Sequence, residues 1–178
     1  MKYFICLLIY LFAYNSYAND VEAPDQSFTT TPMLAPTVRI HRPEELTCMA
    51  KNIYFEAENQ SLRGKLAVGL VTLNRVVSKR FRNTICEVVW RKRRHPDTGK
   101  WVAQFSWTLD GKSDTPLNQK VWDEAMLLAS ALLSTESGIE DFTMGATHYH
   151  ADYVNPWWSQ FLRQIMVIET HIFYKRTS

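Results

Sequence analysis

One carboxylate in this chain lies where a carboxylate is costly, beside the apolar stripe of a predicted helix. At about 100° per residue, the apolar side chains between Leu46 and Ala57 gather on one face, and Glu56 projects only about 20° from Met49. We therefore expect the Glu56 carboxyl to be half buried. Loss of water raises the pKa of a carboxyl group and favours the protonated form, which can donate a proton to a leaving group at neutral pH. The alternative is an edge carboxylate in a structural ion pair.

Two predicted helices position this residue. Pro43 suits the first turn of a helix, with Glu44 and Glu45 near its positive end, and this helix carries Glu56. Ser61 can cap a second helix. Along that helix, apolar or small residues recur at helical spacing: Leu62, Leu66, Gly69, Leu70, Leu73 and Val77. Another helix could approach closely at its small residues, Gly64, Ala67 and Gly69.

The remaining sequence predicts one more helix and a short extended part. A third helix is expected over residues 117–134, with Gly138 marking its end. Residues 165–174 are rich in β-branched and aromatic side chains and are predicted to be extended. The basic run 91–95, followed by residues 96–99, predicts a charged loop with a turn. The expected fold is mainly α (α+β), with a small extended or β part.

The N-terminal residues predict export. Residues 1–18 combine Lys2, an apolar run and a small-residue site ending at Ala18, which is typical of a cleaved secretory signal; a retained membrane anchor is the alternative. Residues 19–42 are rich in Thr and Pro and predict a flexible tether. Residues 43–178 then form one domain. The formal net charge of +2 indicates no particular partner.

Two cysteines remain once Cys6 leaves with the signal. In an exported protein, the even pair Cys48 and Cys86 predicts a disulfide. Closing a loop of this length would stabilise the fold by roughly 3 to 4 kcal/mol in the chain-entropy model. Two free buried thiols are the alternative.

Four short motifs follow one another along residues 48–174. The first is Ile53-Tyr54-Phe55-Glu56-Ala57, and the second joins Ala67-Val68 to Val71-Thr72-Leu73-Asn74-Arg75-Val76. The third is Gln104-Phe105-Ser106-Trp107, reached after Cys86-Glu87-Val88-Val89. The fourth comprises Gly145-Ala146-Thr147-His148-Tyr149-His150, Pro156-Trp157 and His171-Ile172-Phe173-Tyr174. In this order the motifs resemble the SleB-type cell wall hydrolase family.

The resemblance implies a lysozyme-like, mostly helical domain that cuts the glycan strands of peptidoglycan between N-acetylmuramic acid and N-acetylglucosamine. It gives Glu56 the role of the catalytic acid, so the burial argument and the family role fall on one side chain. Peptidoglycan is therefore the expected partner. The export signal predicts a periplasmic or extracellular location, and neither cofactor, metal nor nucleic acid is expected. Two departures stand out: Gln60 replaces a second glutamate, and Glu169-Thr170 stands where the family tends to have glycine.

The resemblance also bears on the mechanism. Most glycosidases use two carboxylates, whereas lytic transglycosylases use one, because the substrate's N-acetyl group assists and its C6 hydroxyl attacks to give 1,6-anhydro muramic acid. Glu58 projects away from Glu56 on a continuing helix. We therefore expect a transglycosylase. A hydrolytic muramidase would need a second acid, such as Asp110, Asp114 or Asp152.

The other candidate site residues are substrate-binding ones: Gln104, Phe105, Ser106, Trp107, Thr147, His148, Tyr149 and Trp157. Gln104 and Ser106 offer neutral hydrogen-bonding groups for a sugar. Their aromatic neighbours offer flat faces for stacking or, alternatively, pack in the core. Tyr149 could donate to the substrate or to the carboxylate, and Trp157 is either a sugar platform or an anchor.

Three further function classes stay open. A non-catalytic peptidoglycan-binding module is suggested by the altered segment Glu58-Asn59-Gln60, although the retained Glu56 argues against it. A metal-dependent amidase or peptidase would use His148 and His150, which share a face if their segment is extended, but a third ligand is needed. A nucleic-acid binder would use the basic run 91–95, although no nucleic-acid motif accompanies it and export argues against DNA.

Overall fold

The computed structural model describes residues 42–177. The predicted signal peptide, residues 1–18, and all but the last residue of the predicted tether lie outside the described residues. The elements in chain order are α1 (Pro43–Ala57), α2 (Leu62–Val77), α3 (Ile85–Val89), β1 (Lys92–Arg94), β2 (Trp101–Ala103), the 3-10 helix η1 (Ser106–Leu109), α4 (Gln119–Leu133), β3 (His148–Ala151), the 3-10 helix η2 (Trp157–Phe161), β4 (Arg163–Ile168) and β5 (His171–Lys175). Within residues 42–177, no helix has the length and apolar character of a membrane span.

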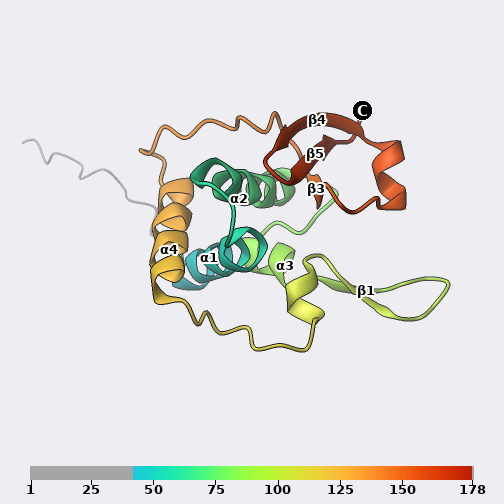
Figure 1. The fold of residues 1–178 in the computed structure, drawn as a ribbon, viewed down its shortest axis with the longest axis horizontal. Helices are drawn as coiled ribbons and strands as arrows, with labels where there is room; N and C mark the ends of the chain where they lie inside the picture. Colours follow the sequence, from blue (N-terminus) through green and yellow to red (C-terminus); the bar gives the residue numbers. More distant parts are fainter. Residues whose placement is uncertain (1–41, 178) are drawn as a thin grey trace, which may run out of the picture. The chain divides into compact units, whose positions relative to one another are not determined.

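The three long helices follow the predictions. Helix α1 begins at Pro43, and Glu44 and Glu45 occupy its first turn. The Ser61 side chain caps α2 by accepting a hydrogen bond from the Gly64 amide at 3.4 Å. Helix α4 buries the predicted face, which includes Ala125, Leu128, Ala129 and Leu132. These helices form the main hydrophobic core (Figure 1).

The predicted apolar face of α2 is wrong at both ends. Leu62 is 56% exposed and Val77 is 80% exposed. Helix α2 instead buries two sides, because α1 and α4 pack on one side and the sheet packs on the other (Figure 1). The residues that contact the sheet are Ala67 and Val71, which lie in a second cluster with Phe173.

The extended C-terminal part is a three-stranded antiparallel sheet in the order β3-β5-β4. The extended prediction for residues 165–174 is confirmed, and the segment contains the turn between β4 and β5. Phe173 of β5 is fully buried against α2. The sheet therefore holds β3, and the side chains on it, beside the helical core.

The prediction of a charged loop for the basic run 91–95 is wrong. Lys92–Arg94 is strand β1, which pairs antiparallel with β2, so the segment is a hairpin and not a loop. The turn of the hairpin includes Gly99, whose φ is +65°. The pairing was missed because both strands have three residues and β1 is exposed along its whole length, which leaves no alternation of burial to read.

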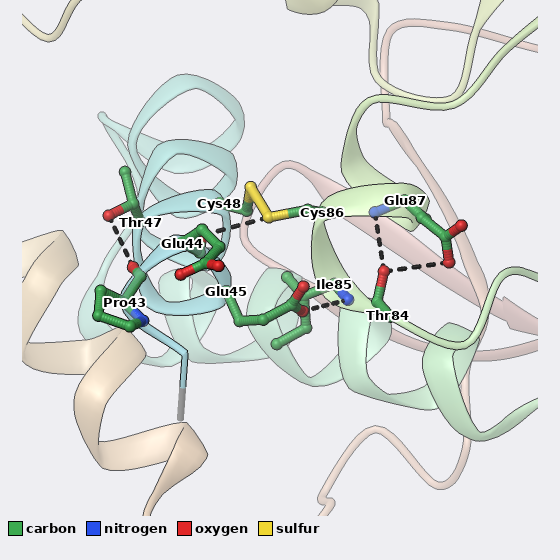
Figure 2. Close-up of a disulfide and its surroundings, with 9 residues drawn as sticks. All are labelled: Pro43, Glu44, Glu45, Thr47, Cys48, Thr84, Ile85, Cys86 and Glu87. Atoms are coloured by element: carbon green, nitrogen blue, oxygen red, sulfur yellow. Dashed lines mark hydrogen bonds between the residues drawn. A yellow bond between two sulfur atoms is a disulfide. The ribbon is translucent and has the colours of Figure 1, made fainter. Parts of the chain in front are cut away.

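The predicted disulfide is present and joins α1 to the short helix α3. Cys48 and Cys86 are bonded, with their Cα atoms 5.2 Å apart. Figure 2 shows a second link beside it, in which the Ile85 amide donates to the Glu45 carboxylate at 2.6 Å. The Thr84 side chain caps α3 by accepting from the Glu87 amide at 3.2 Å. A helix of five residues is thus fixed to the core by a covalent bond and a charged hydrogen bond.

Gly69 lies where α1, α2 and α4 meet. A Cβ atom at this position would overlap Leu132 Cδ1 and would lie 3.4 Å from Ile53 Cδ1. We expect Gly69→Ala to destabilise the fold by about 1 to 3 kcal/mol, the usual cost of overpacking a core. Urea unfolding monitored by circular dichroism measures this. Leu62→Ala, on the exposed start of the same helix, is the control and should change the stability by less than about 0.5 kcal/mol. Equal effects of the two substitutions would contradict the close approach.

Candidate active site

Glu56 lies in the last turn of α1, and its carboxyl is partly buried as predicted. The Tyr149 hydroxyl, from β3, donates a hydrogen bond to Glu56 Oε2 at 2.8 Å. Burial raises the pKa of Glu56, and this effect outweighs the opposing effects of the Tyr149 hydrogen bond and the Arg75 charge. The carboxyl is therefore biased toward the protonated acid, while a donor and a cation remain beside it to stabilise the carboxylate.

Arg75 is the ionised side chain that acts on Glu56. It extends from the last turn of α2, is 4% exposed, and donates from Nε to the Thr147 carbonyl at 2.7 Å. Its guanidinium carbon lies 4.8 Å from the centre of the Phe105 ring and 5.5 Å from that of Phe81. Aromatic faces can hold a buried cation without a salt bridge. The arginine thus brings positive charge near Glu56 without forming an ion pair that would hold the carboxyl ionised.

Tyr149 is held as a hydrogen-bond donor by its surroundings. Its ring contacts Phe173, with ring centres 5.6 Å apart, and His171, at 5.2 Å. Burial and the negative charge of Glu56 raise the pKa of Tyr149 well above its usual value, so the hydroxyl keeps its proton. Of the two acceptors considered for Tyr149, the substrate and the carboxylate, the structure has the carboxylate.

Removing this donor should move the titration of Glu56. The hydrogen bond from Tyr149 lowers the pKa of Glu56 relative to burial alone. In Tyr149→Phe we expect the pKa of Glu56 to rise further, so that the carboxyl stays protonated to a higher pH. Carbon-13 NMR titration of the glutamate carboxyls, with Glu56→Gln to identify the signal, measures this. Tyr153→Phe, at a tyrosine that is 85% exposed, is the control. An unchanged or lower pKa in Tyr149→Phe would contradict the assigned contact.

The prediction that the aromatic pair of the third motif, Phe105 and Trp107, stacks on a sugar is wrong. Phe105 is 3% exposed and Trp107 is 6% exposed, so the core-packing alternative describes both rings. The Trp107 ring stacks on Phe55 at 4.6 Å, and its Nε1 donates to Asn52 Oδ1 at 3.3 Å. Both rings lie at or just before the start of η1 and pack in the core, and the Trp107 ring packs against α1. Neither ring has a free face for a sugar. Beside them, Gln104 is partly buried and Ser106 is exposed.

The histidines of the fourth motif lie on one face of β3, as expected for an extended segment. The rings of His148 and His150 lie 5.3 Å and 5.6 Å from that of Trp158. Burial, followed by the charges of Arg75 and Arg176, lowers the pKa of His148 to about 4, so this ring is neutral. Both ring nitrogens of His150 are within hydrogen-bond distance of a partner: Nδ1 of the Ala151 carbonyl at 2.8 Å, and Nε2 of the Tyr174 hydroxyl at 2.9 Å.

No metal-binding cluster accompanies these histidines. In the part of the chain from residue 42 to 177, no three His, Cys, Asp or Glu side chains converge in a way that could hold an ion. Thr147 instead places its hydroxyl 2.9 Å from His148 Nδ1. Trp157 is 72% exposed, so one face of its ring is available to a ligand.

The four other carboxylates that the sequence offered as a possible second acid or as a neighbour of Glu56 lie outside the helices and strands. Glu58 follows the end of α1 and is exposed, as are Asp110 and Asp152. Asp114 is partly buried in the segment before α4. The hydrogen-bond partner and the ionised neighbour of Glu56 are a tyrosine and an arginine. The chemistry available at Glu56 is therefore that of one carboxyl group which can donate and take back a proton.

The two departures from the family pattern contact each other. Gln60 Nε2 donates to the Thr170 hydroxyl at 3.0 Å, and the Ser61 amide donates to the Glu169 carboxylate at 2.9 Å. The φ of Glu169 is +50°, a left-handed conformation that favours glycine. These contacts join the α1–α2 corner to the β4–β5 turn, so Gln60 has a structural role here.

Arg75 belongs to the second motif, but its position in the sequence did not predict a role at the site. The available signal was a basic residue inside an apolar helical run, between Val71 and Val76. Such a residue is costly to bury unless it has partners.

Comparisons with known proteins agree with this arrangement. The catalytic domain of the Bacillus cereus SleB protein is 27% identical, with a TM-score of 0.55, and the alignment covers 79% of this chain and 98% of that one. The catalytic domain of SleB from Bacillus anthracis is 28% identical, with a TM-score of 0.56 and coverage of 77% and 98%. The predicted mainly α (α+β) fold is thereby confirmed. A search of curated proteins found no match.

The sequence model of the Cell Wall Hydrolase family matches residues 59–174. The match includes Arg75, Tyr149 and the three-stranded sheet up to Tyr174, and it begins just after Glu56. It covers well over half of the chain. This chain belongs to the Cell Wall Hydrolase family.

Proposed function

We propose that this chain is a lytic transglycosylase that cuts peptidoglycan strands between N-acetylmuramic acid and N-acetylglucosamine, with Glu56 as its single acid and base. The observation that supports this most is the Glu56 carboxyl itself, which is partly buried, has a raised pKa and is bonded to Tyr149. The similar catalytic domain from Bacillus anthracis is described as that of a germination-specific lytic transglycosylase. A single carboxyl group is what such a reaction requires.

The reaction needs two proton transfers at one side chain. Protonated Glu56 donates its proton to the oxygen of the leaving sugar as the glycosidic bond breaks. The substrate's N-acetyl group stabilises the positive charge that develops at C1 of the other sugar. The Glu56 carboxylate then takes the proton of the C6 hydroxyl as that oxygen bonds to C1. The 1,6-anhydro product forms and Glu56 is again protonated. Tyr149 and Arg75 stabilise the carboxylate between the two steps.

The remaining parts of the site bind the strand in this proposal. Gln104 and Ser106 supply hydrogen bonds to sugar hydroxyl or acetamido groups. Thr147 and His148 line the approach from β3, with His148 neutral because its pKa is lowered to about 4. Trp157 supplies an exposed aromatic face for a sugar ring. Phe105 and Trp107 support the site from the core and do not touch substrate.

We also propose that the enzyme works outside the cytoplasm, in the periplasm or the extracellular wall. Residues 1–18 would direct export, and the substrate lies there. The Cys48–Cys86 disulfide supports this location, because disulfides persist in oxidising compartments.

The class of reaction can be tested on whole sacculi. We expect the protein to release disaccharide-containing fragments, which means that glycan bonds are cut, and to do so equally well with EDTA present. Mass spectrometry of the soluble fraction identifies the bond. Release of free peptides that stops with EDTA would instead indicate the metal-dependent amidase. Binding to sacculi without any release would indicate the non-catalytic module.

A further inference from the structure

A cleft separate from the Glu56 carboxyl lies between the end of α2 and the end of β5. Its volume is about 440 Å³, within the range of roughly 300 to 1,000 Å³ that is usual for ligand pockets. The lining comes from the end of α2 and the turn after it, from the approach to β3, and from the end of β5: Asn74, Val77, Ser78, Arg80, Phe81, Gly145, Thr147, His148, Lys175 and Arg176.

The lining is cationic. Arg80, Lys175 and Arg176 contribute three positive charges, and the lining contains no carboxylate. Lys175 donates to the Met144 carbonyl at 3.0 Å, whereas neither arginine has a salt bridge to any residue of the described range 42–177. The end of α2 adds a negative partial charge of only about 0.5. The cleft therefore attracts anions, and its concave shape concentrates that attraction.

The acidic residue bonded to this lining is Asp141. Its carboxylate accepts hydrogen bonds from the Asn74 side chain at 3.0 Å and from the Gly145 amide at 2.7 Å. Partial loss of water would raise the pKa of Asp141, but these contacts and hydrogen bonds from Thr143 outweigh it and lower the pKa, so Asp141 remains a single negative charge. One negative charge does not cancel three positive ones, and the two arginines stay available to a ligand.

The cleft is coupled to Glu56 through one buried side chain. Arg75 acts on Glu56 by its charge, and it donates to the carbonyl of Thr147, which lines the cleft. His148, also in the lining, directly precedes the Tyr149 that holds Glu56. The cleft lining and Glu56 therefore share contacts with Arg75 and with consecutive residues of β3.

We propose that this cleft binds the carboxylates of the peptide stems carried by peptidoglycan, so that the enzyme prefers peptide-bearing strands to bare ones. The proposal rests on the proposed function, because it names the part of the substrate that the same site would recognise. The stems are the part of the substrate that carries several carboxylates at a distance from the bond that is cut. Guanidinium groups bind carboxylates through paired hydrogen bonds, which suits Arg80 and Arg176.

The test compares soluble glycan strands that carry stems with the same strands after enzymatic removal of the stems. For the unaltered protein we expect a KM about tenfold lower on stem-bearing strands. In the double variant Arg80→Gln/Arg176→Gln, the KM for stem-bearing strands should rise to that for bare strands, with kcat unchanged. Lys79→Gln, at an exposed cation outside the lining, is the matched control and should keep the preference. Thermal unfolding of each variant confirms that it is folded.

Direct binding gives a second readout that does not depend on catalysis. A stem tripeptide containing diaminopimelate should shift the NMR signals of Gly145 and Lys175, and the double variant should lose these shifts. Equal KM values of the unaltered protein for the two substrates, or shifts with inorganic phosphate but not with the tripeptide, would overturn the proposal. In either case, cleavage of both substrates would leave the proposed function standing. Loss of all cleavage would instead count against the proposed function itself.

Discussion

Replacing Glu56 by glutamine should lower kcat for strand cleavage by roughly 10²- to 10⁴-fold, the usual contribution of a positioned general acid. Glutamine matches the shape of glutamate but cannot donate the proton to the leaving oxygen or later take one from the C6 hydroxyl. The fold should persist, because Tyr149 can still donate to the amide oxygen. Release of soluble fragments from sacculi, measured at saturating substrate, gives kcat.

The matched control for this substitution is Glu58→Gln. Glu58 has the same chemistry, lies two residues further on and is exposed beyond the end of α1. We expect its kcat to stay within about twofold of the unaltered protein, as is usual for exposed positions away from a site. If Glu56→Gln kept more than a tenth of the activity, or if Glu58→Gln lost as much, the role of Glu56 would be wrong.

Replacing both Cys48 and Cys86 by serine should lower the free energy of unfolding by about 3 to 4 kcal/mol, the loop-closure value for cysteines 38 positions apart. For a domain of this size the loss corresponds to a fall in Tm of roughly 10 °C. The effect should centre on α3, because five residues cannot form a stable helix alone. Calorimetry measures Tm, and hydrogen exchange of the α3 amides reports the local effect.

A reductant supplies the control for the disulfide. Dithiothreitol should lower the Tm of the unaltered protein to that of the double serine variant, and it should leave the variant unchanged. If the reduced and oxidised proteins melted at the same temperature, the bond would contribute nothing to stability. That result would also remove a support for export.

The long helices could be predicted because local signals define them. Pro43 and Ser61 mark two helix starts, and α4 shows an apolar period over its whole length. The missed elements are short and depend on partners outside their own segments. Helix α3 is fixed by the disulfide and by Glu45, and β1 is a strand because β2 pairs with it. Periodicity over three to five residues cannot reveal such partners.

The site was also predictable only where local sequence carries the signal. Glu56 was identified because a carboxylate beside an apolar stripe is unusual. Tyr149 was identified because it belongs to the fourth motif. Arg75 received no role, since its partners are a carbonyl on another segment and two aromatic rings. Phe105 and Trp107 were misassigned because an aromatic residue type suits both a core and a sugar platform. Only the direction of the ring separates the two.

The central claim is that one carboxyl group directs an intramolecular attack, and the product of cleavage in ¹⁸O-labelled water tests it most directly. A transglycosylase uses the C6 hydroxyl as the attacking group, so mass spectrometry should find fragments one water lighter than hydrolysis predicts and free of ¹⁸O at the new end. Glu56→Gln should release neither kind of fragment. Fragments with an ordinary reducing end that carries ¹⁸O would contradict the claim, and would mean that a second group activates water beside Glu56.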